Sequence, residues 1–169
     1  MQSSSISIGK FLFNWLLMFV VWLGFTTSLE PTELITGVLV SFIVSLMTIG
    51  VFKCCSLDIF LPQKLFYIFK YTFVFIVALL KANLDVARRV LSPSLPINPG
   101  IVEFETKLTN EFAKMVLANS ITLTPGTLSI DMVGNRFFIH WIDVETEDPT
   151  EAHRIIAKDF EDILLKIFK

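Results

Sequence analysis

Apolar positions in the first half of the chain form long runs, whereas those in the second half alternate with polar ones. Residues 11–29 and 34–52 contain no charged residue, and a third apolar run at 65–88 is interrupted only by a few charges near its ends. A helix as long as either of the first two runs measures about 28 Å, close to the thickness of a bilayer's hydrocarbon core. The pattern therefore predicts membrane helices at about 11–29, 34–52 and 65–88.

Composition agrees with a membrane protein. Of the 169 residues, 53% are hydrophobic and 18% are charged, against roughly 25% charged residues in ordinary soluble domains. A cleaved signal peptide explains the first run less well, because the run is long and no small-residue cleavage site follows Gly24.

The positive charges predict which side of the membrane each end lies on. Arg88 and Arg89 follow the third run and favour a cytoplasmic C-terminal part. Three full spans would then place the N-terminus outside, although Lys10 favours the inside. A hairpin formed by the first two runs, entering and leaving on one side, removes this conflict. Two-span and three-span topologies both remain open.

The membrane segments carry little ion-transport chemistry. A transporter needs ionisable side chains near the bilayer midplane, and the first two runs have none. Lys81 and Asp85 of the third run are spaced for a local ion pair on one helix face. Gly37, Ser41 and Ser45 recur every four residues, which predicts a face on which another helix packs closely.

A proline-rich segment separates the membrane part from a different kind of sequence. Pro93, Pro96 and Pro99 lie within 92–100, and proline cannot continue a helix. We interpret 1–91 as the membrane part, 92–100 as a linker and 101–169 as a small cytoplasmic α/β domain.

The periodicity of this domain predicts the order β-α-β-β-α, without giving the strand order. Alternation predicts two strands near 101–108 and 127–133, and Gly134-Asn135 predicts a hairpin turn into a third at 136–144. Helical spacing predicts a helix over 110–120, and Asp148-Pro149 predicts the start of another. The positions expected to face the core are Val102, Phe104, Thr106, Leu108, Phe112, Ala113, Val116, Leu117, Leu128, Ile130, Met132, Ile156, Phe160, Ile163 and Ile167.

No motif for catalysis, a cofactor or a metal is recognisable. His140 and His153 are interpreted as structural, and the adjacent Cys54 and Cys55 have the spacing of neither a disulfide framework nor a metal site. Residues 100–169 carry seven basic and twelve acidic side chains, a net charge of −5, so nucleic acid is not an expected partner. We expect neither an enzyme nor a cofactor.

One stretch carries a family resemblance. The run Met115 to Thr127 reads MVLANSITLTPGT, and His140-Trp141-Ile142-Asp143 follows it. This pattern, together with the apolar N-terminal half and the more polar C-terminal half, resembles the E subunit of Mrp-type multisubunit cation/proton antiporters of bacteria. The resemblance covers nearly the whole chain. It implies a place in a bacterial plasma-membrane complex that exchanges Na⁺ for H⁺, with other antiporter subunits and the bilayer as partners.

The resemblance also implies a role. In that family the E subunit is accessory: it is required for assembly or activity and does not form the ion pathway. The alternative is a self-standing membrane-anchored interaction or sensory domain. Thr124-Pro125-Gly126-Thr127 has the composition of a type II turn, and we expect Thr124, Pro125, Gly126 and Thr127, with Gly37, Ser41 and Ser45, to contact partner subunits.

Overall fold

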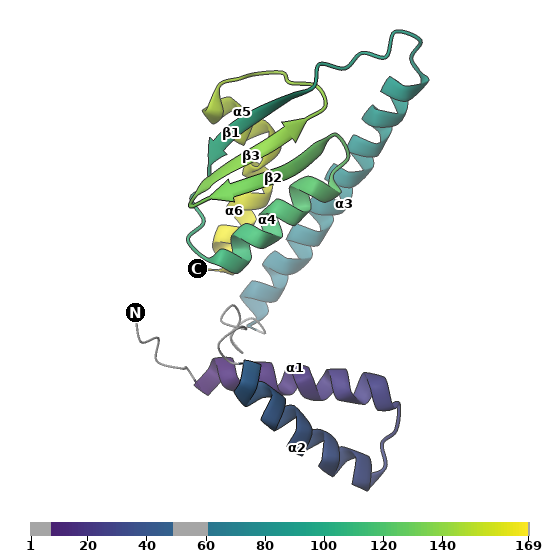
Figure 1. Ribbon diagram of the computed structural model, residues 1–169, viewed down its shortest axis with the longest axis vertical. Coiled ribbons are helices and arrows are strands. Elements are labelled where there is room, and N and C mark those ends of the chain that lie inside the picture. Colours follow the sequence, from purple (N-terminus) through teal and green to yellow (C-terminus); the bar gives the residue numbers. More distant parts are fainter. Residues whose placement is uncertain (1–7, 49–60, 169) are drawn as a thin grey trace. The chain divides into compact units, whose positions relative to one another are not determined.

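The computed structural model of the protein describes residues 8–48 and 61–168 (Figure 1). The chain divides into two compact units, Met1–Pro62 and Gln63–Lys169. Cys54 and Cys55 lie outside the described residues, as does the end of the second predicted run at 49–52.

The first unit contains helices α1 (Ile8–Thr26) and α2 (Pro31–Thr48), which pack as an antiparallel hairpin. Asn14 of α1 donates to Thr48 at the end of α2 (Nδ2–Oγ1, 3.0 Å), and Trp22 donates to the Glu33 carbonyl at its start (3.2 Å). Helix α2 is long and apolar enough to cross a membrane, while the apolar part of α1, Phe11–Thr26, is shorter. Most large apolar side chains of both helices are exposed, as expected for helices surrounded by lipid.

The small-residue stripe of α2 faces α1. Gly37, Ser41 and Ser45 are the buried residues of α2. A Cβ atom added to Gly37 would lie 2.4 Å from Cδ1 of Trp22, far inside van der Waals contact. The stripe is therefore a close-packing face, as the spacing predicted, and the helix packed on it belongs to the same chain.

The second unit is built on a three-stranded antiparallel sheet of β1 (Gly100–Glu105), β2 (Thr127–Val133) and β3 (Arg136–Trp141), in the order β1-β3-β2. Helices α4 (Glu111–Leu123), α5 (Pro149–Ile156) and α6 (Lys158–Ile167) lie on one face of this sheet (Figure 1). The core between the layers includes Val102, Phe104, Leu108, Ala113, Leu117, Ile121, Phe137, Ile139, Trp141, Phe160, Ile163, Leu164 and Ile167.

Most of the predicted core positions are buried, but the element order differs at the end. The final predicted helix is two helices, because the chain breaks at Ala157 (φ −118°, ψ −28°). The order is thus β-α-β-β-α-α. As expected, α5 starts with Pro149 at its first turn and with the Asp148 side chain accepting from the Glu151 amide (2.9 Å).

Strand β2 departs from its predicted pattern. The pairing with β3 shifts between Ser129 and Asp131, so that Ile130 is the extra residue of a β-bulge. Ser129 points toward α4 and donates to the Ala118 carbonyl (3.0 Å), whereas Leu128 and Ile130 are about half exposed. The prediction that Leu128 and Ile130 face the core is therefore wrong, because one inserted residue exchanges the two faces of a strand.

Helix α3 (Pro62–Leu91) belongs to the second unit. The sequence grouped it with the membrane helices, and it is long and apolar enough to cross a membrane. One of its faces nevertheless packs on the core of the sheet domain, where Tyr71 and Phe75 contact the ring of Phe160 at centroid distances of 5.9 and 6.3 Å. That α3 crosses a bilayer stays a prediction.

The predicted linker returns the chain from α3 to the sheet and is attached to the domain. The Asn98 amide donates to the Ile142 carbonyl (3.1 Å), and the Val144 amide donates to the Asn98 carbonyl (2.9 Å). Gly100 already belongs to β1. Residues 92–99 are thus a fixed connection rather than a free spacer.

Candidate functional site

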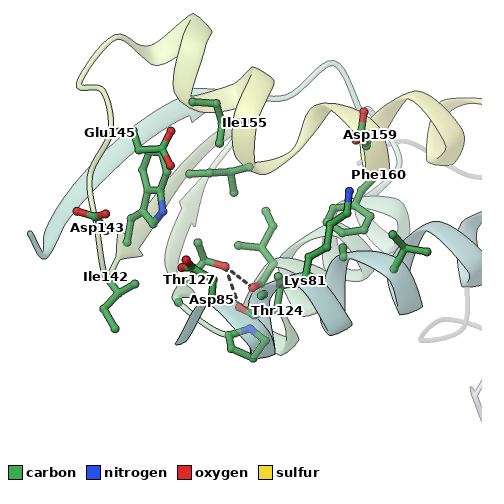
Figure 2. Close-up of a pocket in the computed structure, with 18 of the residues that line it drawn as sticks. Lys81, Asp85, Thr124, Thr127, Ile142, Asp143, Glu145, Ile155, Asp159 and Phe160 are labelled. Atoms are coloured by element: carbon green, nitrogen blue, oxygen red, sulfur yellow. Dashed lines mark hydrogen bonds between the residues drawn. The ribbon is translucent and has the colours of Figure 1, made fainter. Parts of the chain in front are cut away.

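A cavity of about 420 Å³ lies between the C-terminal half of α3 and the sheet domain. Its walls come from α3, the turn between α4 and β2, the segment after β3, and the junction of α5 with α6 (Figure 2). The charged residues lining it are Lys81, Asp85, Arg89, Asp143, Glu145 and Asp159. Apolar side chains such as Ile142 and Phe160 complete it, so the lining combines apolar and charged side chains.

The turn in this wall has the predicted geometry. The Thr127 amide donates to the Thr124 carbonyl (3.3 Å), and Gly126 has φ +97°. Pro125 and Gly126 thus occupy the two central positions of a type II turn, the second of which needs a positive φ. The Gly126 carbonyl accepts from the Ile142 amide (2.8 Å), which attaches the turn to the segment after β3.

The threonine hydroxyls beside the turn close helix α4. Thr124 donates from Oγ1 to the Ser120 carbonyl (2.8 Å), and Oγ1 of Thr127 lies 2.7 Å from the Ile121 carbonyl and 3.0 Å from that of Thr124. The last carbonyls of a helix have no partner within the helix. The two threonines supply such partners here, so their side chains are engaged within the chain.

Ser120 connects the same run to α3. Its hydroxyl donates to the Val116 carbonyl (2.9 Å), so in the contact with Tyr71 the tyrosine hydroxyl is the donor. Ser120 is almost completely buried. The run that carries the family resemblance is therefore also where the domain attaches to α3.

Arg89 holds the other end of α3. Its Nε donates to Oδ2 of Asp85 (2.6 Å), and its Nη1 donates to Oδ2 of Asp143 (2.6 Å) and to the Pro96 carbonyl (2.9 Å). The predicted ion pair of Lys81 with Asp85 is wrong, because Asp85 pairs with Arg89. The planar guanidinium has several donors in fixed directions and can bind two carboxylates at once, which an ammonium on a flexible stem does less well.

Three charges of the cavity are left for other groups. Figure 2 shows Lys81 extending from α3 with its amine on the side where Asp159 and Phe160 lie. Over the ranges that the structure covers, no ion pair forms at Lys81, Glu145 or Asp159. Such an arrangement suits contact with a polar segment of another protein. It holds no pairing of nucleophile and base for catalysis.

The two histidines lie away from this cavity. His153 has Nε2 3.2 Å from Oε2 of the buried Glu161, whose carboxylate also accepts from the Thr106 hydroxyl and the Lys107 amide. His140 is half-buried on β3, opposite Ile101 and Leu128. Within residues 8–48 and 61–168, no three His, Cys, Asp or Glu residues are placed to hold a metal ion.

The structure divides the predicted contact residues between the two units. Gly37, Ser41 and Ser45 pack on α1 within the first unit, whereas the residues from Thr124 to Thr127 line the cavity of the second. Sequence reasoning missed Arg89 as an attachment point and read it only as a sign of membrane orientation. The sequence did contain a signal for the Asp85–Arg89 ion pair, since these two residues also have i,i+4 spacing.

Comparison with known proteins decides the family. Residues 15–167 match the model of the Na⁺/H⁺ ion antiporter subunit family. The chain belongs to this family. Among antiporter E subunits, it is 35% identical over 148 residues to that of Bacillus subtilis (86% of this chain, 90% of the relative). It is 33% identical to that of Alkalihalophilus pseudofirmus over 156 residues (91% and 95%).

A solved structure also resembles this E-subunit family member. A chain in the membrane-bound sulfane sulfur reductase, an archaeal respiratory membrane complex, is 47% identical to it with a TM-score of 0.81, covering 95% of this chain and all of the other. The resemblance to the antiporter E subunit is thus confirmed, and the similar archaeal chain comes from a membrane complex.

Proposed function

We propose that this chain is an accessory subunit of a multisubunit Na⁺/H⁺ antiporter in the plasma membrane, needed for assembly or activity without forming the ion pathway. The family match over residues 15–167 carries the proposal. The sequence supports the accessory role, because 11–29 and 34–52 contain no ionisable side chain that could relay an ion across the bilayer.

In this proposal the α1–α2 hairpin supplies two membrane spans, and both of its ends lie on the cytoplasmic side. The connection between the helices, 27–30, contains no lysine or arginine, whereas Lys10 and Lys53 flank the two ends of the hairpin in the sequence. Basic residues favour the cytoplasmic side. Support from Arg89 is weaker than the sequence suggested, since its charge is engaged by Asp85 and Asp143.

A second candidate is a subunit of a respiratory membrane complex rather than of a self-standing antiporter. The 47% identity to the archaeal chain favours it, since it exceeds the 33–35% identity to the two bacterial E subunits. Purification of the native complex separates the two candidates: redox subunits that copurify support the respiratory complex, and antiporter subunits alone support the antiporter.

The contact surface for a partner subunit is proposed to be the turn from Thr124 to Thr127 together with the cavity beside it. Glu145 lines this cavity and pairs with no cation in the part of the chain that is described. Changing Glu145→Lys should release a neighbouring subunit during purification, whereas Glu147→Lys, an exposed acid outside the cavity, should not. Equal retention by both variants would show that the partner binds elsewhere.

The accessory role is tested by transport in vesicles. Lys81→Gln removes the one lysine of the cavity without breaking an ion pair, and cation-driven proton movement should remain within about twofold of the parent. Deleting the subunit should abolish transport together with assembly. Loss of transport in a fully assembled Lys81→Gln complex would contradict the proposal.

A further inference from the structure

The outward face of α3 carries an apolar stripe from Phe66 to Leu84. Phe66, Phe69, Phe73, Ile76, Leu80 and Leu84 follow one another at three- and four-residue spacing, and each is between 47% and 73% exposed. The opposite face packs on the core of the sheet domain. The sheet domain covers one apolar face of α3. The other apolar face therefore needs a different apolar environment, such as lipid or another protein.

The domain contacts on α3 are too extensive for a membrane-spanning helix. They run from Tyr67, whose ring lies 5.3 Å from Nζ of Lys166, to Arg89, which binds Asp143. That stretch measures about 33 Å at 1.5 Å per residue, as long as the hydrocarbon core is thick. A spanning α3 would therefore carry the open three-stranded sheet into lipid, where unpaired strand edges are not tolerated.

Basic residues border one side of the apolar stripe. Lys70 follows Phe66 by four residues and Arg88 follows Leu84 by four, and both are exposed. Lys70 and Arg88 are 18 residues apart, or five helical turns, so they stand on one line parallel to the helix axis. The single acid of α3, Asp85, is held by Arg89. The exposed face thus presents cations and no free carboxylate.

We propose that α3 lies in the plane of the membrane surface, with its apolar stripe in the headgroup region and Lys70 and Arg88 toward lipid phosphates. An apolar face with a basic border is typical of helices that bind anionic bilayers in this way. The sheet domain rests on the other side of the helix. This placement goes beyond the accessory role, and holds whichever complex the chain joins.

Spin-label depth measurements on the full chain in lipid nanodiscs test the proposal. Cys54 and Cys55 are replaced by serine, and single cysteines are introduced as Phe69→Cys, Ile76→Cys and Leu84→Cys. All three labels should lie at one depth, about 5–10 Å into the headgroup and acyl boundary. Val20→Cys in α1 gives a hydrocarbon reference, and Asp131→Cys gives a water reference; both residues are exposed. A depth that sweeps by about 22 Å from Phe69 to Leu84 would show a spanning helix and overturn the proposal.

Lipid composition provides a second readout. Discs with phosphatidylglycerol should hold the Ile76→Cys label deeper than discs of phosphatidylcholine alone, and Lys70→Gln with Arg88→Gln should abolish this difference. If the Ile76→Cys label lies at the same depth in both lipids while Lys70 and Arg88 are intact, the proposed contact of these two residues with lipid phosphates is wrong. In the assembled complex, a photoreactive residue at Phe69, which is 73% exposed, should crosslink to phospholipid. Crosslinking to another subunit instead would show that a protein covers the stripe.

Discussion

Arg89 on α3 binds Asp143, 54 residues later in the chain, through Nη1 and Oδ2 at 2.6 Å. The same guanidinium holds Asp85 and the carbonyl of Pro96. One side chain thus joins the end of the long helix, the return segment and the segment that follows β3. Because one guanidinium binds two carboxylates and a carbonyl, it holds these three parts of the chain together.

Replacement of Arg89 should loosen this junction. In Arg89→Lys the ammonium can serve one carboxylate but cannot present the planar fork to both. We expect a lower thermal midpoint in detergent and faster proteolysis within 92–97. Arg88→Lys is the matched control, because Arg88 is exposed and neighbours Arg89. Equal behaviour of the two variants would show that the junction does not depend on one guanidinium binding both carboxylates.

A side chain at Gly126 should destabilise the turn beside the cavity. Its φ of +97° is unfavourable for any other residue, and an added Cβ would lie 3.1 Å from Cγ2 of Ile142. Gly126→Ala should therefore cost about 1–3 kcal/mol of stability. Gly134→Ala is the control, since Gly134 has φ +65° and nothing within 4 Å of an added Cβ. Chemical denaturation of the two variants measures the difference, and an equal loss would show that the Ile142 contact is unimportant.

The helical hairpin should depend on Gly37. Leucine at this position would overlap Trp22, and the two helices would separate, because lipid offers no hydrophobic gain for holding them together. Gly37→Leu should reduce the amount of chain recovered in the membrane and in the purified complex. Gly24→Leu adds the same side chain where nothing lies within 4 Å of the Cβ. If both variants are recovered like the parent, the hairpin does not rely on close packing at Gly37.

Acid should weaken the pair formed by Lys158 and Asp162 of α6. Lys158 donates to Asp162 (2.6 Å), and this hydrogen bond holds the pKa of the Asp162 carboxyl below its usual range. A depressed folded-state pKa gives stability that is present above the unfolded value of about 3.9 and is lost as the pH falls through the folded value. The pair is exposed, so the effect is small and salt-sensitive. Thermal midpoints of the parent and Asp162→Asn should therefore converge as the solution is acidified; parallel curves would contradict this.

The strands and caps of the domain were largely predictable, because they depend on local chemistry. Alternation placed Val102 and Phe104 in the core, and the sequence Asp148-Pro149 marked the start of α5. The bulge at Ile130 was not predictable, since its residues alternate as a regular strand does and the shift is fixed by pairing with β3. The break at Ala157 has no proline or glycine to announce it.

The site was less predictable than the fold. The turn geometry followed from Pro125 and Gly126, but the cavity exists only because α3 packs against that turn. Hydropathy along α3 records that its residues are apolar and says nothing about which neighbour covers them. Tyr67, Tyr71 and Phe75 face protein, whereas Phe66, Phe69 and Phe73 are exposed. The two sets interleave in the sequence, so the hydropathy averaged along α3 resembles that of a membrane-spanning helix.

The inner face of α3 also determines where this protein can be cut. A fragment starting in the proline-rich segment would begin at the change in composition, yet it would leave Phe160 without its aromatic neighbours Tyr71 and Phe75. It would also leave Asp143 without Arg89. Such a fragment would expose the apolar surface that α3 covers, and we expect it to aggregate. Recombinant expression of the sheet domain should therefore begin near Pro62, with the long helix retained as part of the folding unit.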